Sequence, residues 1–184
     1  MTKIYTKTGD KGETGLLGGK RIGKNSLEVQ LIGEVDELNA ALGVAILFVH
    51  EEKLKLFLQN IQRDLFKIGA ELAGLHVPPQ GRDARLSNQI IDLEKVGKME
   101  KLIDEFWAQL PELKNFILPG GNAAGANLHL VRVICRRVER ELVVYGQTIS
   151  LRPELYVYLN RLSDFLFASA RWVNFKAGEE EIKV

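Results

Sequence analysis

Five long segments of the chain repeat apolar residues at the spacing of an α-helix. In the first segment the apolar stripe is Val35, Leu38, Leu42, Ala45 and Val49, at steps of three and four residues. This spacing puts every member on one face of a helix, and that face must be buried against other elements. No segment shows convincing alternation typical of a half-buried strand. The pattern therefore predicts an all-α fold, an antiparallel five-helix bundle.

Three further predicted helices span residues 51–75, 87–110 and 123–145, and a fifth begins at Pro153. A break with two prolines and a glycine covers residues 76–85, and Pro119-Gly120-Gly121 marks another. Pro153 suits the first turn of a helix, where its missing N–H is not needed. The predicted core stripes are Leu54, Leu58, Ile61, Leu65, Ile68 and Leu72; Leu128, Val131, Cys135, Val138 and Leu142; and Leu155, Leu159, Leu162, Leu166 and Val173.

Composition places the chain among globular proteins. Its 184 residues predict one domain, with 46% hydrophobic and 27% charged residues. A formal net charge of +1 argues against a nucleic-acid partner recognised through bulk charge. The longest apolar run, residues 40–49, is half of the roughly 20 residues that a membrane helix needs. The N-terminus has no apolar signal core. We therefore expect a soluble cytoplasmic protein without a membrane partner.

The single cysteine, Cys135, lies on the apolar stripe of the fourth predicted helix. An internal disulfide is impossible, and no Cys/His cluster has the spacing of a zinc site. A di-iron bundle is excluded as well, because none of the three histidines follows a glutamate at the required spacing of three residues. We expect Cys135 to be a buried structural thiol.

Residues 6–24 differ from the rest of the chain, with six glycines and five cationic side chains. This glycine density disfavours both helix and strand, so we predict a loop. Backbone N–H groups of such a loop can approach phosphate oxygens while lysines neutralise their charge. The segment matches neither the Walker A motif nor the dinucleotide fingerprint. A flexible N-terminal arm and a polyphosphate-binding loop both remain open on this evidence.

Polar residues also follow the edge of the predicted core. On the fourth helix Arg132, Arg136 and Glu139 share a stripe beside the core face. Solvated charge pairing would explain this stripe, and so would an anion site, because arginine binds phosphate through two parallel hydrogen bonds. Further polar residues lie beside the core stripes of the first and fifth helices: Asp36 and Asn39; and Asn160, Asp164 and Arg171.

Five motifs, in order, resemble those of PduO-type corrinoid adenosyltransferases. They are residues 6–16 (TKTGDKGETGL) with Gly19, Arg21 and Lys24; 33–39 (GEVDELN); 116–121 (FILPGG); 132–140 (RVICRRVER); and 159–164 (LNRLSD). Together they span residues 6–164, whereas residues 76–110 carry no motif of the family. Five motifs in the family's order make a specific match.

The resemblance implies a ferritin-like, cobalamin adenosyltransferase-like five-helix bundle as a single domain of residues 1–184. Within it, residues 1–25 would form a glycine-rich nucleotide-binding loop, residues 26–175 the bundle and residues 176–184 a C-terminal tail. The resemblance also implies a homotrimer with active sites between adjacent subunits.

The activity that the resemblance implies is transfer of the 5′-deoxyadenosyl group of ATP to the Co(I) centre of a corrinoid, with release of triphosphate. ATP would be the co-substrate, Mg²⁺ the metal ion, cob(I)alamin or a related corrinoid the substrate, and a corrinoid reductase a partner.

Site residues are implied in the same way. Arg136 and Glu139 would contact ATP or its metal ion, and Asn160 would help to hold the nucleotide. Asp36 and Arg132 would pair across the subunit interface, and Phe116 would lie beneath the corrin and displace its lower axial ligand. The triphosphate would be bound by Thr6, Thr8, Gly9, Lys11, Gly12, Thr14 and Lys24.

Two other functions fit parts of the sequence. A regulatory ATP-binding bundle would keep the loop and Arg136 without corrinoid binding, although Phe116 argues against it. A purely structural helical oligomer would leave the polar stripes solvated and residues 6–24 without a ligand. The ordered set of five motifs argues against this second alternative.

Overall fold

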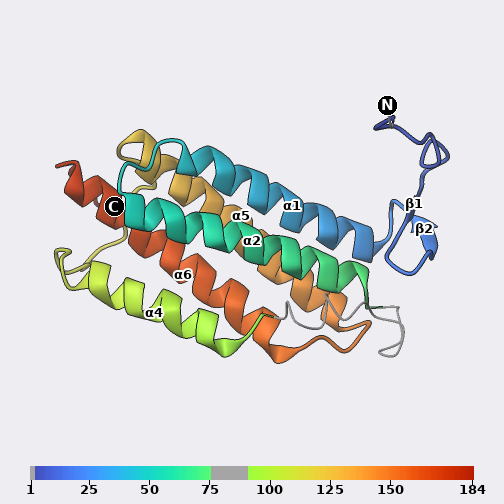
Figure 1. Cartoon of the computed structure of the whole chain (residues 1–184). Coiled ribbons are helices and arrows are strands. Elements are labelled where there is room, and N and C mark those ends of the chain that lie inside the picture. Colours follow the sequence, from blue (N-terminus) through green and yellow to red (C-terminus); the bar gives the residue numbers. More distant parts are fainter. Residues whose placement is uncertain (1–2, 76–90) are drawn as a thin grey trace.

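The computed structural model describes residues 3–75 and 91–184 and contains five long helices within them (Figure 1). They are α1 (Leu27–Ile46), α2 (Glu52–Ala73), α4 (Leu93–Trp107), α5 (Ala123–Gly146) and α6 (Pro153–Lys176). The central pair is α5 and α6; α1 packs against α5 and α2, and α4 packs against α6. In Figure 1, α1 and α2 run antiparallel, as do α5 and α6, whereas α4 runs in the same direction as α6. The predicted five-helix bundle is confirmed.

The predicted apolar stripes form the core. Every residue named in the four stripes is buried, including Leu38, Leu58, Val138 and Leu162, each with no exposed surface. Burying a leucine side chain stabilises a fold by about 1.5–3 kcal/mol, so these stripes are the main force that holds the helices together. Val49 is buried too, although α1 ends at Ile46 and Val49 lies in the connection to α2.

Side-chain caps fix where several helices begin. The Ser26 hydroxyl accepts a hydrogen bond from the Val29 N–H, and the Asn122 side chain accepts one from the Gly125 N–H. Asp92 does the same for the Lys95 N–H, so α4 begins at Leu93 rather than at residue 87 as predicted. Residues 76–90, which include the predicted break, lie outside the described residues. Pro153 stands in the first turn of α6, as predicted.

The glycine-rich segment is more regular than the predicted loop. Strands β1 (Glu13–Gly15) and β2 (Arg21–Gly23) pair antiparallel, with Thr14 opposite Ile22. Gly18 and Gly19 both have positive φ values and close the turn between the strands. Glycine is required at the two turn positions with positive φ and is tolerated at the paired positions Gly15 and Gly23, so a high glycine content did not prevent a short hairpin.

Two further sequence predictions concern Cys135 and membranes. Cys135 is buried, its thiol donates a hydrogen bond to the Leu159 carbonyl, and burial raises the pKa of the thiol well above its usual range. The prediction of a structural thiol is therefore confirmed. In residues 3–75 and 91–184, no helix has both the length and the apolar character that a membrane span requires.

Candidate active site

A cavity of about 350 Å³ lies between the α4–α5 connection and the neighbouring helices α5 and α6. It contains three of the four residues predicted to be catalytic: Phe116, Arg132 and Arg136. The full lining is Leu113, Phe116, Ile117, Arg132, Arg136, Ser163, Asp164 and Phe167. We call this space the Phe116 cavity.

Phe116 is unusual among the apolar residues of the chain because 87% of it is exposed. It lies in the connection between α4 and α5, where the main chain pairs with the C-terminal tail rather than with a helix. The core does not cover this aromatic ring, so its apolar faces are free to contact a ligand.

Arg132 is held at the cavity by an aromatic contact rather than by a carboxylate. Its guanidinium carbon lies 5.7 Å from the centroid of the Phe167 ring, a cation–π distance. Its Nε is buried and forms no hydrogen bond within the described residues. Burial, together with repulsion from Arg136, lowers the pKa of the Arg132 guanidinium. A bound anion or a carboxylate of another chain would relieve both effects.

Arg136 lies one helical turn further along α5 and is exposed. Asp164, which also lines the cavity, is already paired with Arg161 at 2.6 Å, and Arg161 also reaches Glu100 at 2.9 Å. Neither Arg132 nor Arg136 forms an ion pair within the described part of the chain. The cavity therefore presents uncompensated positive charge, which suits an anionic ligand such as a phosphate.

Glu139 and Asn160 connect α5 to α6 beside the Phe116 cavity. The Asn160 amide donates a hydrogen bond of 2.9 Å to a Glu139 carboxylate oxygen. Glu139 follows Arg136 by three residues and so lies on the same side of α5. No cluster of three or more His, Cys, Asp or Glu residues among those described could hold a metal ion. A metal ion at Glu139 would need most of its ligands from another molecule.

The predicted triphosphate-binding residues lie in and beside the hairpin, since Thr14 is in β1 and the others lie just before β1 or just after β2. This part of the chain has internal support. The Arg21 guanidinium donates to the Thr8 carbonyl at 2.7 Å, and the Lys24 N–H donates to the Gly12 carbonyl at 2.8 Å. The hydroxyl oxygens of Thr6 and Thr8 are 2.8 Å apart, and the Lys24 side chain lies against Gly9. Lys11 is exposed, and Thr14 lies in β1.

One chain does not bring all the predicted site residues together. Figure 1 shows the hairpin projecting beyond the end of the bundle where α1 begins, whereas the segment between α4 and α5 lies near the opposite end. Asp36 lines a different cavity of about 540 Å³, between α1 and α2. It is exposed and forms no ion pair with Arg132 within the chain.

Three residues near the Phe116 cavity were not predicted as site residues. Arg171 is buried and binds Glu181 of the C-terminal tail, and Asn174 binds the Gly120 carbonyl. Arg171 stood out in the sequence as a polar residue at the edge of a core stripe. Asn174 and Glu181 gave no such signal, because the partners of Asn174 are main-chain groups and Glu181 itself lies in the irregular tail.

Comparison with known proteins agrees with this geometry. The model of the cobalamin adenosyltransferase family matches residues 4–173. A corrinoid adenosyltransferase of Citrobacter freundii is 44% identical over 171 residues, which are 93% of this chain and 94% of that protein. A corrinoid adenosyltransferase of Bacillus subtilis is 42% identical and covers 98% of this chain, with 91% of its own length matched. The chain belongs to the cobalamin adenosyltransferase family.

Solved structures show the same relationship. A variant of a PduO-type ATP:corrinoid adenosyltransferase from Lactobacillus reuteri, complexed with cobalamin and ATP, has a TM-score of 0.89 to this chain. The two are 32% identical, and the match covers 99% of each chain. The likeness thus includes both the N-terminal hairpin and the C-terminal tail.

Proposed function

We propose that this chain transfers the 5′-deoxyadenosyl group of ATP to the Co(I) centre of a corrinoid and releases triphosphate. The observation that carries this proposal is the Phe116 cavity, where an exposed aromatic ring meets two arginines that have no ion-pair partner in residues 3–75 and 91–184. The ring offers an apolar surface to a corrin, and the arginines offer charge to a phosphate. Relatives with at least 90% of their length matched are corrinoid adenosyltransferases.

The reaction requires little covalent chemistry from the protein. Co(I) of the substrate donates its electron pair to C5′ of ATP, and a cobalt–carbon bond forms. The C5′–oxygen bond breaks at the same time, and its electron pair leaves with the triphosphate. No proton needs to be removed, so neither a general base nor a protein nucleophile is required. Catalysis then depends on positioning the two substrates and stabilising charge on the leaving group.

Arg136 and the hairpin would carry that stabilisation. Arg136 has no competing partner within the described residues, so its guanidinium can bind oxygens of the triphosphate. Lys11 and Lys24 add donors and positive charge, and main-chain N–H groups of a glycine-rich loop can approach phosphate oxygens closely. Thr6, Thr8, Gly9, Gly12 and Thr14 would line this binding loop.

Mg²⁺ fits the residues present. It is usually held by one or two carboxylates together with substrate phosphates and water, and Glu139 supplies one carboxylate. When bound, the ion would neutralise charge on the triphosphate. The hydrogen bond from Asn160 would hold the Glu139 carboxylate in place for the ion and its nucleotide.

Phe116 would act on the corrinoid. Placed beneath the ring, its side chain would occupy the space of the lower axial ligand and leave four-coordinate cobalt(II), which is easier to reduce to Co(I). A corrinoid reductase would supply the electron. The same proposal places the enzyme in the cytoplasm, as one domain spanning residues 1–184.

We also propose that the enzyme is a homotrimer whose sites lie between adjacent chains. The hairpin and the Phe116 cavity lie at different ends of one chain, so a complete site is more easily built from two. Among the residues that the structure describes, Asp36 is exposed and has no side-chain partner, and Arg132 keeps a buried Nε without a hydrogen bond. An ion pair between Asp36 of one chain and Arg132 of the next would satisfy both groups.

An anaerobic assay tests the function. Chemically reduced cob(I)alamin is mixed with MgATP and the protein, and the visible spectrum and the phosphate product are followed. Adenosylcobalamin formed with one equivalent of triphosphate is the expected result. Binding of ATP without a cobalt–carbon bond would instead favour a regulatory bundle, and binding of neither substrate would leave only the fold in common with the family.

A further inference from the structure

The position of Phe116 depends on its main chain, because its side chain packs against almost nothing. The ring is 87% exposed, and the neighbouring Leu118 is 53% exposed. A segment whose side chains are not buried must be held by hydrogen bonds if it is to keep one conformation. Residues 111–120, here called the Phe116 segment, are held through their main chain by residues of α6 and the C-terminal tail.

The first support is the C-terminal tail. Ile117 and Lys183 form an antiparallel bridge, in which the Val184 N–H donates to the Phe116 carbonyl and the Leu118 N–H donates to the Ile182 carbonyl, both at 2.9 Å. Ile182 is 64% exposed and Val184 is 76% exposed, so the tail is not held by burial of its own apolar side chains. Something else must fix the tail.

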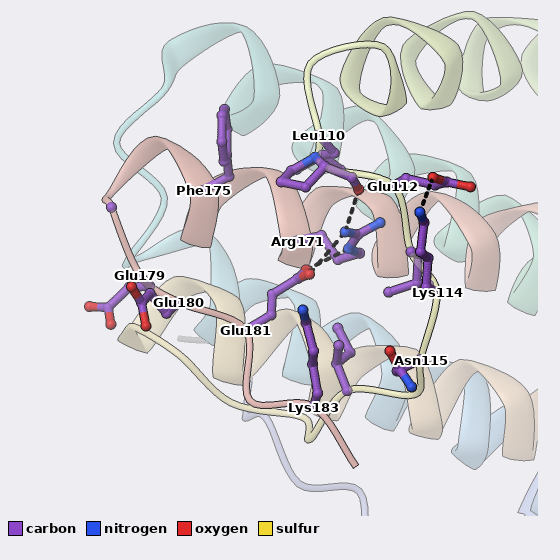
Figure 2. A pocket seen from close by; sticks show the side chains of 14 residues that line it. Leu110, Glu112, Lys114, Asn115, Arg171, Phe175, Glu179, Glu180, Glu181 and Lys183 are labelled. Atoms are coloured by element: carbon purple, nitrogen blue, oxygen red, sulfur yellow. Dashed lines mark hydrogen bonds and ion pairs between the residues drawn. The ribbon is translucent and has the colours of Figure 1, made fainter.

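That fixing group is Arg171 on α6. Its guanidinium has no exposed surface and binds both oxygens of Glu181, through Nε at 2.5 Å and Nη2 at 2.9 Å. Nη2 also donates to the Pro111 carbonyl at 3.1 Å, at the start of the Phe116 segment. Figure 2 shows Arg171 lying between Glu181 and the main chain near Leu110, with hydrogen bonds to both. One buried side chain therefore ties together the tail, the Phe116 segment and α6.

The tail is not held by close packing beside the Arg171–Glu181 ion pair, because a cavity lies there. The tail and the α4–α5 connection enclose a cavity of about 460 Å³, which Arg171 and Glu181 both line (Figure 2). Trp107 covers the guanidinium from the other side, with its ring centroid 4.8 Å from the Arg171 carbon. The Arg171 side chain has no exposed surface, so water weakens its ion pair with Glu181 less than it weakens a pair at the surface.

Asn174 supports the other end of the Phe116 segment. One turn beyond Arg171, its amide donates to the Gly120 carbonyl at 2.9 Å and accepts from the Asn122 N–H at 3.1 Å. A Cβ at Gly121 or at Gly125 would overlap the Asn174 side chain, so both positions require glycine. The Asn174 carbonyl also accepts a hydrogen bond from the Glu179 N–H, where the tail begins.

We propose that Arg171, together with Asn174 and Glu181, forms a buried anchor on α6 that positions Phe116 for the corrinoid. These are positioning residues, since none of them lines the Phe116 cavity. The functional half of this inference rests on the proposed adenosyl transfer, whereas the mechanical half concerns only the hydrogen bonds of the tail.

The mechanical half is tested by amide hydrogen exchange on full-length Glu181→Ala and its control Glu180→Ala. Glu180 is the adjacent, exposed glutamate of the tail and has no partner within the described residues. We expect amide hydrogens of Glu181→Ala to exchange about tenfold faster at Leu118 and Val184, and at the wild-type rate in α5. Local opening of the tail costs less free energy in this variant, because no ion pair has to be broken. Unchanged exchange at Leu118, or equal effects of both substitutions, would overturn the anchor.

The functional half uses the same proteins with cob(I)alamin and ATP. Loss of Phe116 positioning should raise the KM for cob(I)alamin about tenfold while changing the KM for ATP less than about twofold. The spectrum of cob(II)alamin bound to Glu181→Ala should show less of the four-coordinate form. In both the KM and the spectrum, Arg171→Lys should lie between wild type and Glu181→Ala, because lysine keeps the charge but not the two-point contact. Faster exchange with unchanged cob(I)alamin KM and spectrum would contradict the positioning role.

These two measurements separate the inference from the function on which it rests. If wild-type protein forms no adenosylcobalamin, the proposed function fails, yet the exchange rates at Leu118 still show whether the anchor holds the Phe116 segment. If wild type is active and Glu181→Ala equals it in every readout, the anchor alone is wrong.

Discussion

At the scale of single residues, the two arginines of α5 have different environments. Arg132 is half-buried against Phe167 and has a lowered pKa, whereas Arg136 is exposed and its side chain has no partner within the described residues. Arg132 is suited to an ion pair at an interface, and Arg136 to a ligand that binds and dissociates. Arg136 is therefore the residue whose loss should affect chemistry without affecting assembly.

Replacing Arg136 with alanine tests this difference. We expect kcat to fall about 100-fold, as for the loss of one donor to a developing negative charge, with the oligomer unchanged. Arg140→Ala is the matched control, because Arg140 is an exposed arginine on the same helix and uses one nitrogen to bind the Arg136 carbonyl. Kinetics and sedimentation are measured for both, and dissociation of Arg136→Ala would assign that residue a structural role.

His129 makes the stability of the fold depend on pH. Burial, with a smaller effect of Arg132, lowers the pKa of His129 to about 4. Because the folded state binds the proton more weakly than the unfolded chain, whose histidine pKa is about 6.5, His129 favours folding above that value. This contribution is lost as the pH falls from about 6.5 towards 4.

The pH effect can be isolated with His129→Gln, whose side chain does not titrate. The urea midpoint of wild type should fall more steeply than that of the variant between pH 7 and pH 5. Other titrating groups are common to both proteins and cancel in the comparison. Parallel midpoints over this range would show that His129 takes up its proton without unfolding the site.

At the scale of elements, the sequence predicted helices better than it predicted irregular segments. Repeats of apolar residues recur over many turns, so α2, α5 and α6 were located to within a few residues. The hairpin β1–β2 was missed because its strands are three residues long and too short for any alternation to be visible. The bridge between Ile117 and Lys183 was missed for a similar reason, since pairing between distant irregular segments leaves no local pattern.

The hairpin also carries a prediction of its own. Its cationic side chains repel one another and its turns are rich in glycine, so without an anion we expect frequent opening. Trypsin should cut within residues 6–24 more slowly in the presence of MgATP than without it. Adenosine, which lacks the triphosphate, should give no protection. Equal cutting under all conditions would mean that the hairpin does not bind the triphosphate.

At the scale of the whole molecule, the site residues in one chain form three separate groups. The Phe116 cavity, Asp36 and the hairpin are each well defined, but a single copy does not unite them. The motifs of the sequence named residues in all three groups, although Leu113 and Phe167 of the Phe116 cavity lie outside them. Their separation was invisible in the sequence, because spacing along a helix fixes which face a residue occupies but not which chain that face meets.

Asp36→Asn tests whether Asp36 meets another chain. Removing its charge should weaken association and raise the dissociation constant of the oligomer about tenfold, since Arg132 would be left without its partner. Glu52→Gln, which removes an exposed carboxylate from the first turn of α2, is the control. Sedimentation over a dilution series measures both variants, and unchanged association with unchanged activity would remove the proposed pairing.

The most direct test of the whole account is complementation between two inactive chains. One carries Lys11→Ala and Lys24→Ala on either side of the hairpin, and the other carries Arg136→Ala. Each is assayed alone for adenosylcobalamin formation, then after the two are co-assembled and their mixing is verified by mass. If sites lie between chains, mixed oligomers contain some sites with an intact hairpin and an intact Arg136, and activity should reappear. Mixed oligomers that remain as inactive as the separate variants would contradict a site shared between chains.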